Sequence, residues 1–139
     1  MMRKYLLMLA AVAALLVSCH ESLEKRAQRE AWEYTEKNCP TPWTNSVRTD
    51  SVVFDIPTRT YTYFCCVNGK MDNEELIKAH WQNISDGLRE EVVANTGLKA
   101  YKEAGFCFRY LMYSNSKPGK LLYNITISPN DYNTDSARR

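Results

Sequence analysis

The stretch SVVFDIPTRTYTYFCCV, residues 51–67, shows the clearest strand pattern in the chain. In residues 51–56 every second side chain is strongly apolar, which is the period of a strand with one buried face. Residues 60–67 are rich in Thr, Tyr, Phe, Cys and Val, which suit a pleated, half-buried surface. The turn Pro57-Thr58-Arg59 separates the two runs, so this stretch predicts a β-hairpin.

Helical patterns precede and follow this hairpin. Residues 21–37 are mostly strong helix formers, with apolar side chains spaced by three or four at Leu23, Ala27, Ala31 and Tyr34. After the capping arrangement of Asp72 and Glu75, a stronger stripe continues to about residue 95. Its members are Ile77, Trp81, Ile84, Leu88 and Val92. The sequence therefore predicts two helices, one on each side of the first hairpin.

A second hairpin is predicted near the end of the chain. Residues 106–113 and 121–127 both alternate in the manner of strands, and the turn composition Lys117-Pro118-Gly119 lies between them. The element order is then helix, hairpin, helix, hairpin (αββαββ). We expect an α+β fold with a four-stranded, mainly antiparallel sheet and the helices on one face, while the strand order stays open.

The first nineteen residues carry an export pattern. Arg3 and Lys4 precede an apolar run over residues 5–17, which is shorter than the roughly 20 residues that a membrane span needs. The four residues Leu16-Val17-Ser18-Cys19 resemble the lipobox of bacterial lipoproteins. This resemblance implies cleavage before Cys19 and acylation of its thiol and new amine. With His20 rather than Asp after the cysteine, it also implies an outer-membrane location, which we expect to face the periplasm.

These patterns predict the organisation of the chain. We expect a cleaved signal peptide at 1–18, a lipid anchor with a tether and the start of a helix at 19–30, one α+β domain at 31–128 and a mobile tail at 129–139. Removal of the signal takes away Arg3 and Lys4, which leaves 16 basic and 16 acidic residues. A neutral mature chain gives no argument for nucleic acid as a partner.

The cysteines after the anchor are Cys39, Cys65, Cys66 and Cys107. An exported chain can keep disulfides, and period-two counting puts Cys66 and Cys107 on one face, where adjacent strands would allow a disulfide between them. Cys39 would then pair with Cys65 or stay free. The alternative is that the cysteines pack as small apolar residues. The chain has no Cys-x-x-Cys and two histidines, His20 and His80, so we expect no metal site and no cofactor.

Period-two counting along the predicted strands also separates two faces of the sheet. The more apolar face, which we expect the helices to cover, carries Val52, Phe54, Ile56, Tyr61, Tyr63, Cys65, Phe106, Phe108, Tyr110, Met112, Tyr123 and Ile125. The opposite face is a candidate binding face. If the helices cover the more apolar face, the opposite face combines apolar side chains with an acidic and a basic group, a mixture typical of contact surfaces. Its candidate residues are Asp55, Thr62, Phe64, Arg109, Leu111, Tyr113 and Asn124. Leu122 is placed on the same face. The alternative is an ordinary solvent face with scattered apolar residues, or one covered by the first helix.

Three function classes remain. The first is a noncatalytic, lipid-anchored envelope protein whose domain binds a protein or peptide partner. The second is a periplasmic protein that inhibits or sequesters an envelope enzyme, an analogy with known helix-and-hairpin inhibitors. The third is a Cys-dependent enzyme with His80 as its base, although no motif around His80 or the cysteines supports such a site. We therefore expect no enzymatic activity.

Overall fold

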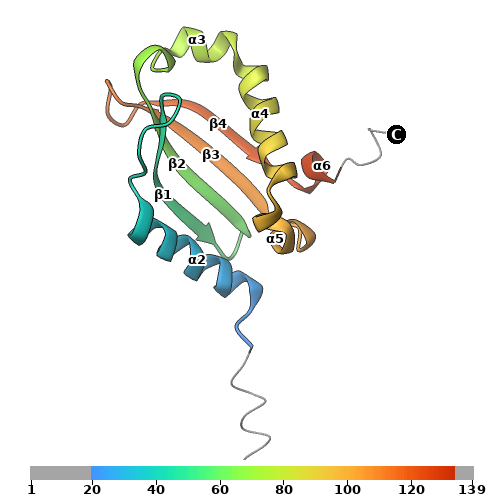
Figure 1. Cartoon of the computed structure of the whole chain (residues 1–139). Coiled ribbons are helices and arrows are strands. Elements are labelled where there is room, and N and C mark those ends of the chain that lie inside the picture. The colour runs from blue at the N-terminus through green and yellow to red at the C-terminus, as the bar shows by residue number, and fades with distance from the viewer. Residues whose placement is uncertain (1–19, 134–139) are drawn as a thin grey trace, which may run out of the picture.

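A computed structural model describes residues 20–133 (Figure 1). The helices and strands, in chain order, are α2 (Leu23–Asn38), β1 (Val47–Asp55), β2 (Thr60–Val67), α3 (Glu74–Ala79), α4 (Trp81–Ala94), α5 (Lys99–Glu103), β3 (Cys107–Ser114), β4 (Leu121–Ile127) and α6 (Pro129–Tyr132). Short 3₁₀ helices lie at Gly69–Met71 and Thr96–Leu98. Both predicted hairpins are present.

The four strands form one sheet in the order β1-β2-β3-β4. The two hairpins pair antiparallel within themselves, whereas β2 and β3 run parallel in the centre. A parallel pair needs a long connection, and residues 68–106, with α3, α4 and α5, supply it. The predicted α+β class and four-stranded, mainly antiparallel sheet are therefore confirmed.

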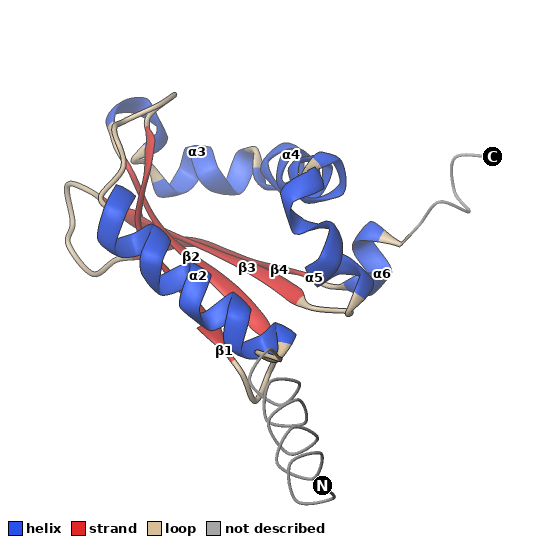
Figure 2. Ribbon diagram, turned by 60° about the horizontal axis from the view of Figure 1, so that its bottom comes forward, coloured by secondary structure: helices blue, strands red, loops and turns tan. Residues whose placement is uncertain are grey.

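The helices cover one face of the sheet (Figure 2). One core cluster joins Ala27 and Ala31 of α2 and Val92 of α4 to the strand residues Phe54 and Phe108. A second cluster places Ile77 of α3 against the sheet near the β3–β4 loop. The side chains assigned to the covered face by period-two counting all lie in these clusters or pack against them. They are Val52, Phe54, Ile56, Tyr61, Tyr63, Cys65, Phe106, Phe108, Tyr110, Met112, Tyr123 and Ile125.

The predicted second helix is two helices. α3 ends and α4 begins at His80, whose backbone (φ −108°, ψ 15°) leaves the helical region. The helix also starts one residue later than expected, because Asn73, not Asp72, accepts the hydrogen bond of the Leu76 N–H as its N-cap. Asp72 instead accepts hydrogen bonds from Ser114 and Ser116 in the β3–β4 connection.

The folded part is longer than the predicted 31–128. Ala27 is completely buried, so the packed domain already includes the first half of α2. At the other end, residues 129–132 form α6, and the Tyr132 hydroxyl donates to the Phe106 carbonyl at 2.8 Å. The predicted mobile tail is therefore wrong for these four residues. The predicted signal peptide, Cys19 and residues 134–139 lie outside the described part of the chain.

Among residues 20–133, no helix combines the length and the apolar character that crossing a bilayer requires.

Candidate binding groove between α2 and α4

The predicted binding face forms on the uncovered side of the sheet, in two parts. Thr62, Arg109 and Asn124 line a shallow polar cavity of about 430 Å³ together with Asp55. Arg109 Nε donates to Asn124 Oδ1 at 3.3 Å. Tyr113 lines a different cavity, which also includes Arg48, Cys66 and Pro118.

Three predicted residues of this face are less available for contact with a partner, because they are buried or already hydrogen-bonded. Leu111 is only 6% exposed, and Phe64, its neighbour across β2 and β3, is half-buried. Asp55 accepts hydrogen bonds from the backbone N–H and the hydroxyl of Thr58, which hold its pKa below the usual range. Because this carboxylate closes the β1–β2 turn, its hydrogen-bonding capacity is already partly used.

Leu122 lies inside, contrary to expectation. The pairing of β3 with β4 shifts between Met112 and Tyr113, whose partners are Tyr123 and Leu121. Leu122 is thus the extra residue of a β-bulge, and it is 8% exposed in the core cluster around Ile77.

A second cavity, of about 330 Å³, lies on the covered face between α2 and α4, and we refer to it as the tyrosine groove. In Figure 1, α2 follows β1 and α4 lies over the β4 side, with the central strands visible between them. The residues that line the tyrosine groove are Tyr34, Thr49, Val52, Tyr61, Tyr63, Cys65, Glu91, Asn95 and Tyr110. The strands provide the floor, α2 contributes Tyr34 and the end of α4 contributes Glu91 and Asn95.

A row of tyrosines forms the floor of the groove. Tyr61 and Tyr63 lie on one face of β2, two residues apart, and Tyr110 of β3 is directly opposite Tyr63. The Tyr63 and Tyr110 rings stack with centroids 4.7 Å apart and planes 9° apart, while the Tyr61 and Tyr63 centroids are 5.6 Å apart. Stacked aromatic rings stabilise one another, so these contacts favour the ring positions that form the floor.

The hydroxyls of the groove tyrosines are not used inside the protein. Among the described residues, the hydroxyls of Tyr34, Tyr61, Tyr63 and Tyr110 make no hydrogen bond. Tyr61 and Tyr110 are each only 7% exposed, but no fully buried side-chain oxygen within residues 20–133 lacks a partner, so their hydroxyl oxygens are open to water in the groove. By contrast, the hydroxyls of the core residues Tyr101, Tyr123 and Tyr132 bond to Glu30, Ser85 and backbone carbonyls, respectively.

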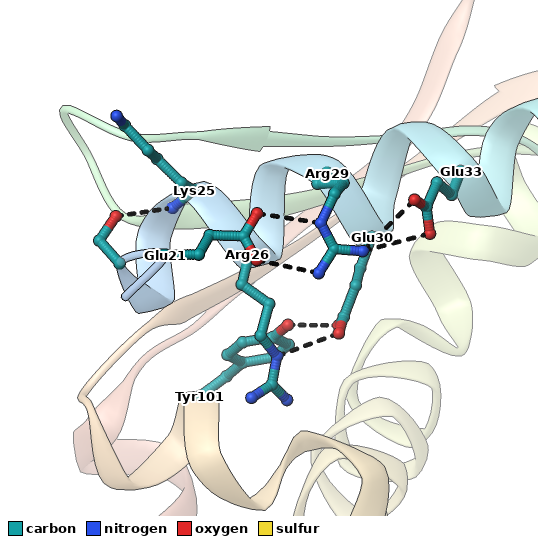
Figure 3. Close-up of polar contacts among 8 residues, drawn as sticks. Glu21, Lys25, Arg26, Arg29, Glu30, Glu33 and Tyr101 are labelled. Atoms are coloured by element: carbon teal, nitrogen blue, oxygen red, sulfur yellow. Dashed lines mark hydrogen bonds and ion pairs between the residues drawn. The ribbon is translucent and has the colours of Figure 1, made fainter. Parts of the chain in front are cut away.

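The α2 wall of the groove is held in place by polar contacts. Thr35 Oγ1 accepts from the Val52 N–H at 2.8 Å and donates to the Val52 carbonyl at 2.9 Å, which ties α2 to the outer edge of β1. Figure 3 shows the Tyr101 hydroxyl of α5 at the Glu30 carboxylate, with Arg26 beside both. Burial and the bond to Glu30 raise the pKa of Tyr101 to about 12, so it donates at neutral pH.

Electrostatically, the groove is neutral except for one carboxylate. Burial raises the pKa of Tyr61, Tyr63 and Tyr110 well above that of free tyrosine, and the negative charge of Glu91 raises the last two further. Burial likewise raises the pKa of the Cys65 thiol to about 11. At neutral pH the groove therefore presents neutral hydroxyls, a neutral thiol and the Glu91 carboxylate.

The predicted disulfide between Cys66 and Cys107 is wrong. The strands are adjacent, but they are parallel, so Cys66 pairs with Tyr113 and Cys107 with Thr60 at opposite ends. Six residues of strand separate the two cysteines by about 20 Å, and a disulfide requires Cα atoms within about 7 Å. All four described cysteines are free, and Cys65 and Cys66 are buried, as the packing alternative expects.

The structure does not bring His80, the candidate catalytic base, to any of the described cysteines. His80 is exposed at the junction of α3 and α4, and no hydrogen bond joins it to a described cysteine. No set of three or more His, Cys, Asp or Glu side chains within residues 20–133 is arranged to hold a metal ion.

Sequence reasoning assigned the floor of the groove to the core and did not find the groove. Period-two counting correctly placed Tyr61, Tyr63 and Tyr110 on the covered face. The available signal was their chemistry, because three tyrosines on two adjacent strands bring three hydroxyls that a core must satisfy.

Comparison with known proteins identifies a family and a fold. A family model described as "Domain of unknown function (DUF8479)" matches residues 22–123. No curated protein matches the chain.

Three solved structures are similar to this one. A Pseudomonas aeruginosa protein, provisionally described as secreted, has a TM-score of 0.67 and 14% identity over 81% of this chain and 99% of its own. A pilotin from the type 2 secretion system of Vibrio vulnificus has a TM-score of 0.60 and 10% identity over 79% and 91% of the two chains. A type II secretion system pilotin from Vibrio cholerae has a TM-score of 0.56 and 13% identity over 78% and 91%. At these identities the likeness establishes a shared fold.

Proposed function

Because the chain belongs to the DUF8479 family of domains of unknown function, we propose its role from the groove and the fold: a noncatalytic, lipid-anchored envelope protein that binds a protein or peptide partner in the tyrosine groove. The fold supports an envelope role, since it is shared with two secretion-system pilotins and with a protein provisionally described as secreted.

The observation that carries this proposal is the set of unused hydroxyls. Tyr61 and Tyr110 are more than nine-tenths buried, line a cavity and lack a hydrogen-bond partner among the described residues. No fully buried side-chain oxygen within residues 20–133 lacks a partner, so these hydroxyl oxygens reach the water in the groove and can exchange it for a partner's polar groups on binding. Rigid aromatic side chains with one polar atom are also typical of binding hot spots.

The anchor part of the proposal rests on Leu16-Val17-Ser18-Cys19. Two or more acyl chains on Cys19 would hold the protein stably on a membrane, whereas one chain gives only marginal binding. With His20 after the cysteine, we place the protein at the outer membrane with its domain in the periplasm.

Site-specific photo-crosslinking in the native bacterium tests the groove against the uncovered face. The variants Tyr34→p-benzoylphenylalanine and Asn95→p-benzoylphenylalanine place the probe on the two sides of the groove, at side chains that are both exposed. The matched control is Thr126→p-benzoylphenylalanine, at an exposed position in the cavity of the uncovered face.

We expect the same protein adduct from both groove positions and none from position 126. Adducts from position 126 alone would assign binding to the uncovered face. The absence of a shared adduct from positions 34 and 95 would refute partner binding in the groove.

A further inference from the structure

The lining of the tyrosine groove carries charge of one sign only. Of its nine residues, Glu91 is the single Asp or Glu, and none is Lys, Arg or His. The carboxylate makes no ion pair and no hydrogen bond with another residue in the part of the chain that the structure describes. It is therefore free to accept bonds from a partner.

Glu91 lines the same cavity as the floor tyrosines. Its negative charge acts on both Tyr63 and Tyr110, the stacked pair in the middle of the floor, and raises the pKa of each. A carboxylate and partnerless hydroxyls thus border the same cavity of about 330 Å³. Val52 and the tyrosine rings supply apolar surface in the same cavity.

Neighbouring carboxylates on α4 are outside the groove. Glu90, the residue before Glu91, is exposed and does not line the cavity. The negative character of the groove is thus a property of Glu91 at its rim, and Glu90 provides a control of the same chemistry on the same helix.

We propose that the tyrosine groove receives a basic side chain, arginine or lysine, of the partner. This inference rests on the proposed function and adds the chemistry of the ligand. The partner's aliphatic stem lies on Val52 and the tyrosine rings, and its charged head donates to the Glu91 carboxylate and to tyrosine oxygens. Charge-assisted hydrogen bonds of this kind are about twice as strong as neutral ones.

An acidic or purely apolar ligand suits the groove less well. An acidic ligand would bring a second negative charge beside the exposed Glu91 carboxylate at the rim, and like charges repel. An apolar ligand would desolvate the hydroxyls and the carboxylate without replacing their hydrogen bonds to water.

Nuclear magnetic resonance with ¹³C-labelled tyrosine rings tests the ligand chemistry on the complete domain. The probe is N-acetyl-arginine amide, and the matched neutral probe is N-acetyl-citrulline amide, which has nearly the same shape without the positive charge. Both are titrated at constant ionic strength, because charge interactions weaken as salt increases.

We expect arginine amide to shift the ring signals of Tyr61, Tyr63 and Tyr110 saturably, with no saturable shift from citrulline amide. Glu91→Gln should weaken arginine binding by up to about fivefold, the change expected when an ion pair at an exposed carboxylate is lost. Glu90→Gln should leave it unchanged.

Two results would overturn the inference: equal binding of both probes, or no shift of the groove tyrosines with arginine amide. If either occurred while positions 34 and 95 still formed one shared adduct in cells, the groove would bind its partner by other chemistry. Loss of that adduct would instead remove the proposed function itself.

Discussion

Thr35 joins α2 to the free edge of β1 through a single hydroxyl. Its Oγ1 both accepts from the N–H and donates to the carbonyl of Val52, at 2.8 and 2.9 Å. Thr35→Val keeps the branched shape but removes both bonds, so we expect a loss of about 1–3 kcal/mol in the free energy of unfolding, measured with urea. The control is Thr126→Val, which replaces an exposed hydroxyl with no hydrogen bond to any described residue. Equal effects of the two variants would contradict this role of Thr35.

Glu74 makes stability depend on pH at the start of α3. Its carboxylate accepts from Lys120 at 2.6 Å and pairs with Lys78 at 3.0 Å, and these contacts lower its pKa to about 2. Because the folded-state pKa is below the ordinary value, the stabilisation is present above about pH 4.5 and is lost as the pH falls towards 2. We expect the difference in urea midpoint between the native protein and Glu74→Gln to shrink over this range. A difference that stays constant from pH 6 to pH 2 would show that the charge of Glu74 does not stabilise the fold.

At the scale of elements, the β1–β2 turn is tied to its neighbours by Arg59. Its guanidinium donates to the Ala104 carbonyl at 2.7 Å, lies 4.9 Å from the centroid of the Phe106 ring and pairs with Glu24 at 3.4 Å. One side chain thereby joins the turn to α2 and to the segment between α5 and β3.

Loss of these contacts should be measurable. We expect Arg59→Ala to lower the free energy of unfolding by about 1–2 kcal/mol in urea titrations, because the hydrogen bond and the cation–π contact are both removed. Lys99→Ala, which truncates a side chain 78% exposed on α5, should change it by less than about 0.5 kcal/mol. Similar values for the two variants would mean that Arg59 is an ordinary surface residue.

The hairpins could be predicted because their pattern is local. Three other features of the fold could not be predicted from a local pattern. The periodicity of apolar residues continues across His80, so the break between α3 and α4 leaves no mark in the sequence. The parallel pairing of β2 and β3 depends on where the connection over residues 68–106 returns the chain. The bulge at Leu122 shifts a face by one residue within an otherwise regular strand.

At the scale of the whole molecule, the groove depends on the spacing of elements far apart in sequence. Tyr34 and Glu91 belong to helices that contact the same sheet face, and the distance between these helices determines how much of the floor stays open. Alternation along β2 and β3 placed the floor tyrosines on the covered face, but it carries no information about this distance. From the sequence, the face on which the floor tyrosines lie could therefore be predicted, but the groove above them could not.

Attachment to the membrane concerns the whole molecule as well. We expect Cys19→Ser to move the protein from the membrane fraction to the soluble fraction and to remove the acyl mass measured on the intact chain. Cys39→Ser, a change of the same kind at a cysteine within the domain, should leave the protein in the membrane fraction. Retention of Cys19→Ser on the membrane would refute the proposed anchor.

An anchor at Cys19 would also orient the domain. Four Cα–Cα steps from Cys19 to Leu23, the first residue of α2, span at most about 14 Å. The ion pair of Glu24 with Arg59 places the β1–β2 turn at this same end, whereas the β3–β4 loop over residues 115–120 lies at the opposite end of the strands (Figure 1). Because eight strand residues extend about 26 Å, these two ends should differ clearly in their distance from the lipid.

We therefore expect nitroxide-labelled lipid in nanodiscs to broaden the amide signals of residues 56–59 more than those of residues 115–120 in the acylated protein. Unacylated Cys19→Ser, mixed with the same nanodiscs, provides the control and should show no such difference. Equal broadening at both ends of the acylated protein would mean that the domain turns freely on its anchor. Stronger broadening at residues 115–120 would place the opposite end of the strands nearer the lipid and would refute this orientation.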